Sequence, residues 1–416
     1  MEYGLIGEKL IHSYSPQIHA QLGPYEYELF PMPPEKLHDF MHKKLFKGIN
    51  VTIPYKKAVI PYCDHLSPDA AEIQAVNTIV KNSDGTLTGH NTDIFGFMTM
   101  LEAAGIEPKD KKAVILGSGG TSLTAQIALK RMRAREIVVI SRNGPDDYQS
   151  LYEKHADAQL LVNTTPVGMY PRNGISPVDL NLLPNVESVA DVIYNPEKTA
   201  LILQAMEKGL KTVSGLHMLV AQARKAAELF TGTAIDVKKD LQIVHKIKEQ
   251  MLNLVLIGMP GCGKSTIGKM VAQAMNRPLI DTDQEIEKLA GKTIPEIFAQ
   301  DGEEAFRAME ERVVLQACSQ QGAVITTGGG AILRKPNRLA MASNSRVCML
   351  CRPLDQLSKE GRPLSKDAEA LESLWQERKD LYFNTADFQI HNTTDPQQTA
   401  CRTLEGFYEA AGDERP

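Results

Sequence analysis

The sequence has no long apolar run, no excess of basic charge and few cysteines for its length. No stretch approaches the roughly 18 apolar residues of a membrane span, and the N-terminus lacks the basic start and apolar segment of a signal peptide. The 46 Lys and Arg against 51 Asp and Glu give a net charge of -5, which excludes a dedicated nucleic-acid or anionic-membrane binder. The six cysteines show no disulfide-like spacing. We therefore expect a cytoplasmic protein with reduced thiols, which binds small molecules rather than nucleic acid or membrane and could form a homodimer.

The pattern of apolar residues predicts an α/β protein of two or three ordinary domains. The chain has 416 residues, of which 43% are hydrophobic and 23% charged. From Lys111 onward strands and helices alternate, which is typical of nucleotide-binding sheets. A polar helix pattern at 236–250 predicts a linker. The other predicted elements are strands at 3–6, 111–116, 136–140, 159–165, 188–194 and 252–257, a hairpin around 82–85, a strand and a helix start within 47–60, and helices after Pro16 and at 121–132, 199–208 and 217–231.

A phosphate-binding loop follows the predicted linker. The segment 258–265 reads GMPGCGKS, and it lies between a strand pattern and a helix pattern. In this motif backbone N–H groups wrap the phosphates, the Lys meets the β and γ charges and the Ser holds magnesium. The predicted ATP contacts are Gly261, Gly263, Lys264, Ser265 and Thr266.

Charged residues after this loop predict an acceptor site. The run 279–283 is predicted as a strand whose alternation points Asp281 and Asp283 to one side, so that one can reach magnesium and the other an acceptor hydroxyl. A solvated strand end is the alternative. A second glycine turn at 328–330 allows close approach of the backbone. Arginines follow at three positions, each of which, taken singly, is more often a surface residue than a ligand: Arg307, Arg362 and Arg378.

Together these motifs resemble those of shikimate kinase, from about Asn253 to Asp395. They occur in the family's order as GMPGCGKST, DTDQEIE, GEEAFRAME, TTGGGA, GRPL and RKDLY. One departure is the lid, because only SKEG separates Leu357 from Arg362 where the family has a longer, more basic segment.

The resemblance implies a role for each of these residues. Asp283 would bind the shikimate hydroxyls and act as the base, and Arg362 would come from a mobile lid that neutralises charge during transfer. Lys264 and Ser265, together with Asp281 through a water, would serve ATP and Mg2+. A forked guanidinium suits a planar carboxylate. The implied contacts of the substrate carboxylate are Arg307, Gly329, Gly330 and Arg378.

A glycine turn in the first half predicts a dinucleotide site. Gly117, Gly119 and Gly120 follow one strand pattern and open a helix pattern, although the third glycine position is Ser122. After the next strand, Arg142 stands where an acid would bind a ribose hydroxyl, which favours the 2'-phosphate of NADP(H). An Arg that merely caps the strand is the alternative.

Small polar groups at the ends of several apolar runs resemble those of shikimate dehydrogenase over about residues 2–235. The matching motifs are HSYSP at 12–16, NVTIPYK at 50–56, AVNT at 75–78, GHNTD at 89–93, VNTTPVGM at 162–169, DVIYNP at 191–196 and GLHMLVAQA at 215–223. Taken alone, the first of these motifs could be only a helix N-cap.

The resemblance implies that Lys56 and Asp93 form the catalytic pair. Hydride addition to a ketone leaves an alkoxide, which needs a proton donor and a charge that stabilises it. A structural ion pair is the alternative, and the sequence leaves open which of the two transfers the proton. The other implied substrate contacts are Ser13 and Ser15 for the carboxylate, with Thr52, Asn77, Asp93, Gln222 and Tyr194 around the ring. The implied cofactor contacts are Gly117, Gly119 and Gly120 at the pyrophosphate, Arg142 at the 2'-phosphate, and Gly215 and Met218 on the nicotinamide side.

We therefore expect a bifunctional enzyme that reduces 3-dehydroshikimate with NADPH and phosphorylates the resulting shikimate with ATP and Mg2+. The alternative is a quinate/shikimate dehydrogenase joined to a degenerate, regulatory nucleotide-binding half. The expected domains are an α/β substrate-binding domain over 1–100 with return helices at about 215–235, a Rossmann-type NADP-binding domain over 101–214, the linker helix over 236–250 and a P-loop kinase α/β domain over 251–416.

Overall fold

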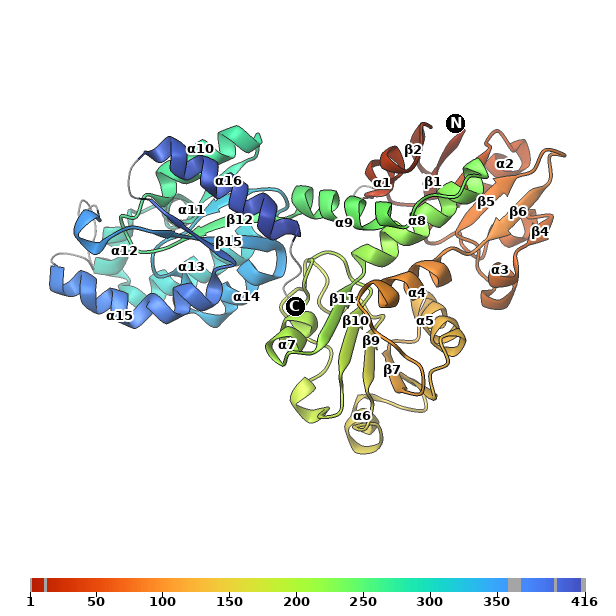
Figure 1. Cartoon of the computed structure of the whole chain (residues 1–416), viewed down its shortest axis with the longest axis horizontal. Coiled ribbons are helices and arrows are strands. Elements are labelled where there is room, and N and C mark those ends of the chain that lie inside the picture. The colour runs from red at the N-terminus through yellow and green to blue at the C-terminus, as the bar shows by residue number, and fades with distance from the viewer. Residues whose placement is uncertain (1, 11–12, 358–367, 393–394, 413–416) are drawn as a thin grey trace. The chain divides into compact units, whose positions relative to one another are not determined.

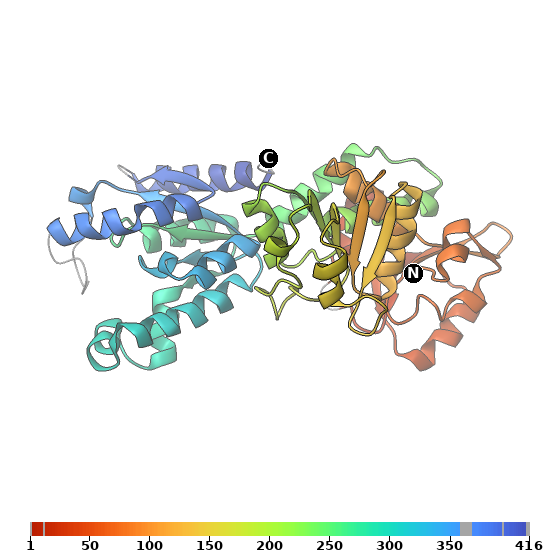
Figure 2. The same cartoon turned by 90° about the horizontal axis from the view of Figure 1, so that it is seen from below.

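The computed structural model describes residues 2–10, 13–357, 368–392 and 395–412. Three separate sheets organise the chain, and helices flank each of them (Figures 1 and 2). This is the mixed α/β architecture that the sequence predicts. Among the described helices, none is long and apolar enough to cross a membrane.

The chain divides into two compact units. The first comprises 1–167, 177–194 and 204–244, and the second comprises 168–176, 195–203 and 245–416. The first unit contains two of the sheets and the second contains one. Two short segments from the middle of the chain therefore belong to the second unit.

The first sheet has six strands in the order β2-β1-β3-β5-β6-β4. β1 runs parallel to β2 and β3, whereas β5 is antiparallel to β3 and β6. The carboxyl ends of β1, β3 and β6 and the start of β5 therefore meet at one edge, where the polar motifs of the first half gather. The strands are β1 (Tyr3–Gly7), β2 (Tyr27–Pro31), β3 (Gly48–Val51), β4 (His65–Leu66), β5 (Thr78–Lys81) and β6 (Leu87–His90).

The helix start predicted after β3 is wrong. Residues 53–59 form turns, followed only by the 3-10 helix η1 (Ile60–Tyr62). Pro54 and Pro61 explain the difference, because each lacks the N–H that a continuing helix requires. The turn still anchors Lys56, whose carbonyl accepts a hydrogen bond from the backbone N–H of Val76 at 2.8 Å.

The second sheet is fully parallel, in the order β11-β10-β9-β7-β8. Its first strand in the chain, β7, lies between β8 and β9. The chain therefore turns in opposite directions on the two sides of β7, and such a switch point leaves a crevice at the carboxyl ends. Helix α5 (Gly120–Arg131) begins at this crevice. The strands are β7 (Lys112–Leu116), β8 (Glu136–Ile140), β9 (Leu160–Asn163), β10 (Ser188–Asp191) and β11 (Lys211–Ser214).

The third sheet repeats this arrangement in the order β13-β14-β12-β15-β16. β12 lies between β14 and β15, and helix α10 (Lys264–Met275) starts beyond its carboxyl end. Helices α10 and α16 lie on one side of the sheet and α13 to α15 on the other (Figure 1). The strands are β12 (Asn253–Ile257), β13 (Leu279–Asp281), β14 (Val324–Thr326), β15 (Ser345–Cys351) and β16 (Phe388–His391).

The prediction of one strand over 279–283 is wrong. β13 ends at Asp281, whose Oδ1 accepts hydrogen bonds from the backbone N–H groups of Asp283 (3.1 Å) and Gln284 (3.3 Å). Asp281 thus caps helix α11 (Thr282–Ala290), because Asp is a favourable N-cap residue. Asp283 lies in the first helical turn, so strand alternation does not relate the two carboxylates.

The helices predicted at 199–208, 217–231 and 236–250 are confirmed as α7, α8 and α9. Together with α5, α10 and α11, the helices are α1 (Ser15–Leu22), α2 (Pro34–Lys43), α3 (Pro68–Ile73), α4 (Asp93–Ala103), α6 (Tyr148–Lys154), α7 (Ala200–Glu207), α8 (Leu216–Thr231), α9 (Lys238–Met251), α12 (Ile294–Gln300), α13 (Gly302–Cys318), α14 (Lys335–Asn344), α15 (Ala368–Thr385) and α16 (Pro396–Gly412).

Helices α4 and α8 pack closely at Gly96. A Cβ on this glycine would lie 2.7 Å from the backbone oxygen of Met218 and 2.9 Å from Cβ of Gln222. Both neighbours are fixed parts of α8, so the space cannot be opened by a side-chain rotation. Gly96 therefore sets the distance between two helices that carry predicted site residues.

Replacing Gly96 by Ala should destabilise the first unit by about 1–2 kcal/mol. Ala gains about 1 kcal/mol over Gly in helix propensity, but overpacking costs about 1–3 kcal/mol. Because the neighbours of Gly96 include backbone atoms, which cannot move aside, we expect an overpacking cost toward the upper end of that range. Urea unfolding monitored on the first unit measures the change. Gly120→Ala, where a Cβ meets nothing within 4 Å, is the matched control in the absence of nucleotide. Equal stability of the two variants would contradict the packing argument.

Candidate active sites

The first unit contains a cavity of about 620 Å³. It lies at the edge where β1, β3, β5 and β6 meet, and the end of β10 and helix α8 complete its wall. All eight residues predicted to bind or transform the substrate line it: Ser13, Ser15, Thr52, Lys56, Asn77, Asp93, Tyr194 and Gln222. The fold therefore brings together residues that are more than 200 positions apart in the sequence.

Lys56 and Asp93 form an ion pair in this cavity. Lys56 Nζ donates to Asp93 Oδ2 at 2.6 Å, and Asn77 Nδ2 donates to Asp93 Oδ1 at 2.9 Å. Asp93 is the first residue of α4, where the helix dipole stabilises a carboxylate. Both oxygens of the carboxylate are thus held, and the side chain of Lys56 is one-third exposed to the cavity and solvent.

A buried network that the sequence did not predict supports this pair. Asn50 donates from Nδ2 to Thr78 Oγ1 (2.9 Å) and to the carbonyl of Asn77 (3.3 Å). Its Oδ1 accepts from the hydroxyl of Tyr27 at 2.7 Å. The ring of His19 stacks on Tyr27 with 3.8 Å between centroids. Asn50 is part of a recognised motif, but its structural role could not be inferred without knowing that β3 pairs with β5.

His19 is neutral because it is buried. Burial lowers its pKa from 6.5 to about 3, and a hydrogen bond with Asn50 opposes part of the shift. Nδ1 lies 2.7 Å from the hydroxyl of Tyr25. The imidazole can therefore bridge Tyr25 and Asn50 as one donor and one acceptor without carrying charge.

Polar groups at the other side of the cavity suit a carboxylate and hydroxyls. Ser13 Oγ donates to Ser15 Oγ at 3.1 Å, at the start of α1. Gln222 Oε1 accepts from Thr92 Oγ1 at 3.4 Å. Burial raises the pKa of Tyr194, so its phenol remains protonated and can donate.

The glycine turn after β7 leaves open space for a ligand. Gly117 has a φ of 101°, which side chains rarely adopt, and a Cβ on Gly119 or Gly120 would meet nothing within 4 Å. Gly215 and Met218 line the substrate cavity, whereas Gly117, Gly119, Gly120 and Arg142 lie outside its lining. A Cβ on Gly215 would lie only 1.9 Å from the carbonyl oxygen of Val192, so no larger residue fits there.

Arg142 is exposed directly after β8, on the same carboxyl edge as the glycine turn. The nearby acid Asp147 does not compete for it, because its carboxylate caps α6 and accepts from the backbone of Gln149 and Ser150 at 3.1 and 2.8 Å. The positive charge of Arg142 opposes the rise that burial causes in the pKa of Tyr148. The guanidinium is therefore free of a carboxylate partner among the described residues.

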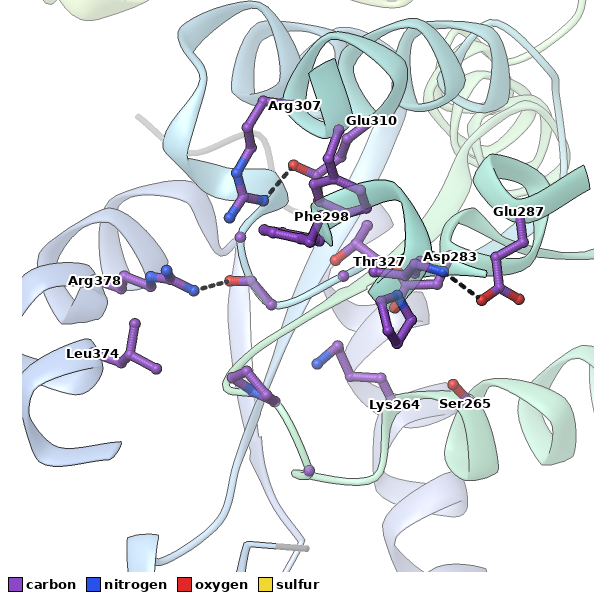
Figure 3. Close-up of a pocket in the computed structure, with 18 of the residues that line it drawn as sticks. Lys264, Ser265, Asp283, Glu287, Phe298, Arg307, Glu310, Thr327, Leu374 and Arg378 are labelled. Carbon is purple, nitrogen blue, oxygen red and sulfur yellow. Dashed lines mark hydrogen bonds and ion pairs between the residues drawn. The ribbon is translucent and has the colours of Figure 1, made fainter. Parts of the chain in front are cut away.

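The second unit contains a cavity of about 520 Å³ between the phosphate loop and helices α13 and α15 (Figure 3). Arg362 lies outside the described residues, as does the SKEG segment before it. The predicted residues that line the cavity are Gly261, Gly263, Lys264, Ser265, Thr266, Asp283, Arg307, Gly329, Gly330 and Arg378.

The phosphate loop holds Lys264 in position. Its ammonium donates to the carbonyls of Gly258 (2.9 Å) and Met259 (3.0 Å). Ser265 Oγ donates to Asp281 Oδ2 at 2.9 Å, and the same oxygen accepts from Thr326. A hydroxyl and a carboxylate so close together are oxygen donors that suit Mg2+.

Two arginines stand at the other end of this cavity. Arg307 pairs with buried Glu310 at 2.7 Å, and Arg378 donates to the carbonyl of Gly329 at 3.5 Å (Figure 3). A Cβ on Gly330 would collide with the guanidinium of Arg307, so the arginine can lie against the glycine turn only because residue 330 has no side chain.

Glu310 was not predicted as a site residue. Burial raises its pKa, while the charge of Arg307 opposes that rise. Its spacing from Arg307, i and i+3 on a helix, was visible in the sequence, but its burial was not.

Comparisons with known proteins agree with both cavities. Residues 5–79 match the family model of the shikimate dehydrogenase substrate binding domain, and residues 260–407 match that of shikimate kinase. A shikimate dehydrogenase (NADP(+)) of Clostridium beijerinckii is 39% identical over 254 residues, which cover 57% of this chain and 94% of the relative. The chain belongs to the shikimate dehydrogenase family. The kinase match adds a second domain, and the chain is a bifunctional shikimate-pathway enzyme, an oxidoreductase and a kinase that uses NADP and a nucleotide.

Solved structures place the dehydrogenase half in the same fold. The shikimate 5-dehydrogenase of Thermus thermophilus, solved with NADP(H) and shikimate, is 32% identical with a TM-score of 0.54, covering 59% of this chain and 99% of that one. A quinate dehydrogenase of Corynebacterium glutamicum, solved with NAD, is 30% identical with a TM-score of 0.54, covering 58% of this chain and 98% of that one.

The first unit should lose stability in acid through His19. In the unfolded chain His19 binds a proton near pH 6.5, whereas the buried ring of the folded protein binds one only near pH 3. The contribution of neutral His19 to the free energy of unfolding is therefore complete above pH 6.5 and is lost as the pH falls toward 3. The loss is about 1.4 kcal/mol per pH unit in this window, or about 2 kcal/mol at pH 5. Urea unfolding across this range measures it.

His19→Gln should reduce that slope by about one proton. Tyr25→Phe is the control, because it removes the partner of Nδ1 but keeps the imidazole, and its slope should match that of the wild type. An unchanged slope in His19→Gln would show that His19 does not titrate differently in the two states.

Proposed function

We propose that this chain reduces 3-dehydroshikimate to shikimate with NADPH and then phosphorylates shikimate to shikimate 3-phosphate with ATP. The Lys56–Asp93 pair in the first cavity is the observation that carries the first reaction. For the second, Lys264 and Asp283 line one cavity with a pair of arginines at its far end. The product of the first half is the substrate of the second.

In the reductase, Lys56 donates the proton, and Asp93 orients the ammonium group of Lys56. NADPH supplies the hydride, and the oxygen that gains negative charge needs a donor at the cavity surface. The ammonium has protons to give, whereas an ionised carboxylate only accepts. Asp93 is held by Asn77 and by the start of α4, so it fixes the position of the ammonium throughout the reaction.

The remaining polar groups orient the substrate. Ser13 and Ser15 hold the carboxylate, and Thr52, Asn77, Tyr194 and Gln222 surround the ring. Arg142 provides a forked cation for the 2'-phosphate, which favours NADPH over NADH. Gly117, Gly119 and Gly120 let the pyrophosphate approach the backbone at the start of α5, and Gly215 and Met218 face the nicotinamide.

In the kinase, Asp283 accepts the proton of the acceptor hydroxyl while Lys264 stabilises the phosphates. Arg307, Arg378 and the backbone at Gly329 and Gly330 hold the carboxylate of shikimate. Ser265 binds Mg2+, with Asp281 acting through a water, and Mg2+ would neutralise phosphate charge there. Gly261, Gly263 and Thr266 complete the nucleotide contacts, and Arg362 is proposed as the lid cation.

The proposed functional division follows the sequence: substrate binding by 1–100 with return helices at about 215–235, NADP binding by 101–214, a linker at 236–250 and the kinase at 251–416. We also propose a cytoplasmic enzyme. The rival proposal is a quinate/shikimate dehydrogenase whose second half is regulatory. The similarity to a quinate dehydrogenase solved with NAD supports this alternative.

A single incubation tests the proposal. Purified protein with 3-dehydroshikimate, NADPH, ATP and Mg2+ should yield shikimate 3-phosphate, identified by mass, only when both cofactors are present. Lys56→Ala should slow the reduction of 3-dehydroshikimate by about 100-fold or more. The same variant should phosphorylate added shikimate at the rate of the wild type. Asp283→Asn should accumulate shikimate. Each variant is the control for the other, and accumulation of shikimate by the wild type would reject the kinase half.

Arg142→Ala should raise the KM for NADPH by about tenfold or more, because a charge-assisted contact with the 2'-phosphate is lost. The KM for NADH should stay unchanged, since NADH lacks that phosphate. Initial rates with the two cofactors measure the ratio. Equal effects on both would contradict the assignment of Arg142.

A further inference from the structure

Arg352 stands beside the phosphate loop, although no motif of the sequence marks it. Strand β15 runs parallel to β12 with Met349 opposite Ile257. Continuing each strand by three residues places Arg352 opposite Pro260, at the opening of the loop. Consistent with this register, a Cβ on Gly258 would lie 2.5 Å from the backbone oxygen of Leu350. Arg352 also lines the second cavity, together with Gly261 and Lys264.

The guanidinium of Arg352 has no protein anion to neutralise it within the described ranges. Its Nε is buried and lacks a hydrogen-bond partner there. By contrast, Arg307 pairs with Glu303 and Glu310. A buried donor without an acceptor is costly, so native proteins rarely keep one unless a ligand or water completes it.

The position of Arg352 favours a phosphate ligand over the acceptor carboxylate. The carboxylate end of the cavity already has Arg307 and Arg378, which are anchored near Gly330 and Gly329. At the phosphate loop, Lys264 is the cation that the motif supplies, and a triphosphate carries several negative charges. A forked guanidinium beside Pro260 matches the oxygens of a phosphoryl group.

We propose that Arg352 binds the terminal phosphate of the nucleotide and supplies a cation for its transfer. This inference rests on the proposed kinase function, because it requires ATP in the second cavity. It adds a residue to the phosphate site that directly follows strand β15 and is not part of the loop motif.

Calorimetric titration of the full chain with ATP and with ADP, without acceptor, tests the proposal. Arg352→Ala should weaken ATP binding by about tenfold or more and ADP binding by much less, since ADP lacks the terminal phosphate. The ATP affinity of Arg352→Lys should lie between those of the wild type and Arg352→Ala, because Lys keeps the positive charge but lacks the forked donors of the guanidinium. Arg402→Ala, an exposed arginine on α16, is the matched control and should bind both nucleotides as the wild type does.

Three results would overturn the inference. They are unchanged ATP binding in Arg352→Ala, an equal loss of ATP and ADP binding, and a selective rise in the KM for shikimate, which would place the guanidinium at the carboxylate. Thermal unfolding of each variant separates a lost contact from a lost fold. A wild type that binds ATP but leaves shikimate unphosphorylated would reject only the proposed acceptor, whereas a wild type that binds no ATP would reject both proposals.

Discussion

Parallel strands present their carboxyl ends at one edge of a sheet, and the chemistry of this chain depends on that constraint. Beyond the last ladder bond, backbone N–H groups and short polar side chains have no strand partner, so a ligand or a loop must satisfy them. The glycine turn after β7 and the phosphate loop after β12 both stand at such an edge. In both of these sheets the first strand lies between two later strands, and such an order leaves a crevice beside the loop.

Buried polar side chains hold Asp93 and Arg307 in position. Asn77 binds Asp93, and Asn50 in turn fixes the backbone of Asn77. In the second unit, Glu310 performs a similar task for Arg307. Such networks are costly to break, because each buried donor or acceptor left alone loses its full solvation. They therefore give the cavities a defined geometry before a ligand enters.

Glycine serves two different purposes in these sites. At Gly117 and Gly263 the backbone adopts a positive φ, which side chains rarely tolerate. At Gly215 and Gly330 the reason is space, since a Cβ would meet the carbonyl of Val192 or the guanidinium of Arg307. The first purpose shapes a loop, and the second lets two parts of the chain approach each other.

The sequence by itself determined the α/β class, most of the strands, several of the helices and many of the residues that line the two cavities, because these depend on local periodicity and on motifs of fixed spacing. It mispredicted 279–283, where the capping carboxylate of Asp281 starts a helix, and the helix start after β3, where prolines prevent one. Only the tertiary structure identified Asn50, His19, Glu310 and Arg352. Their roles come from burial and strand register, which join residues distant in sequence and leave no local pattern.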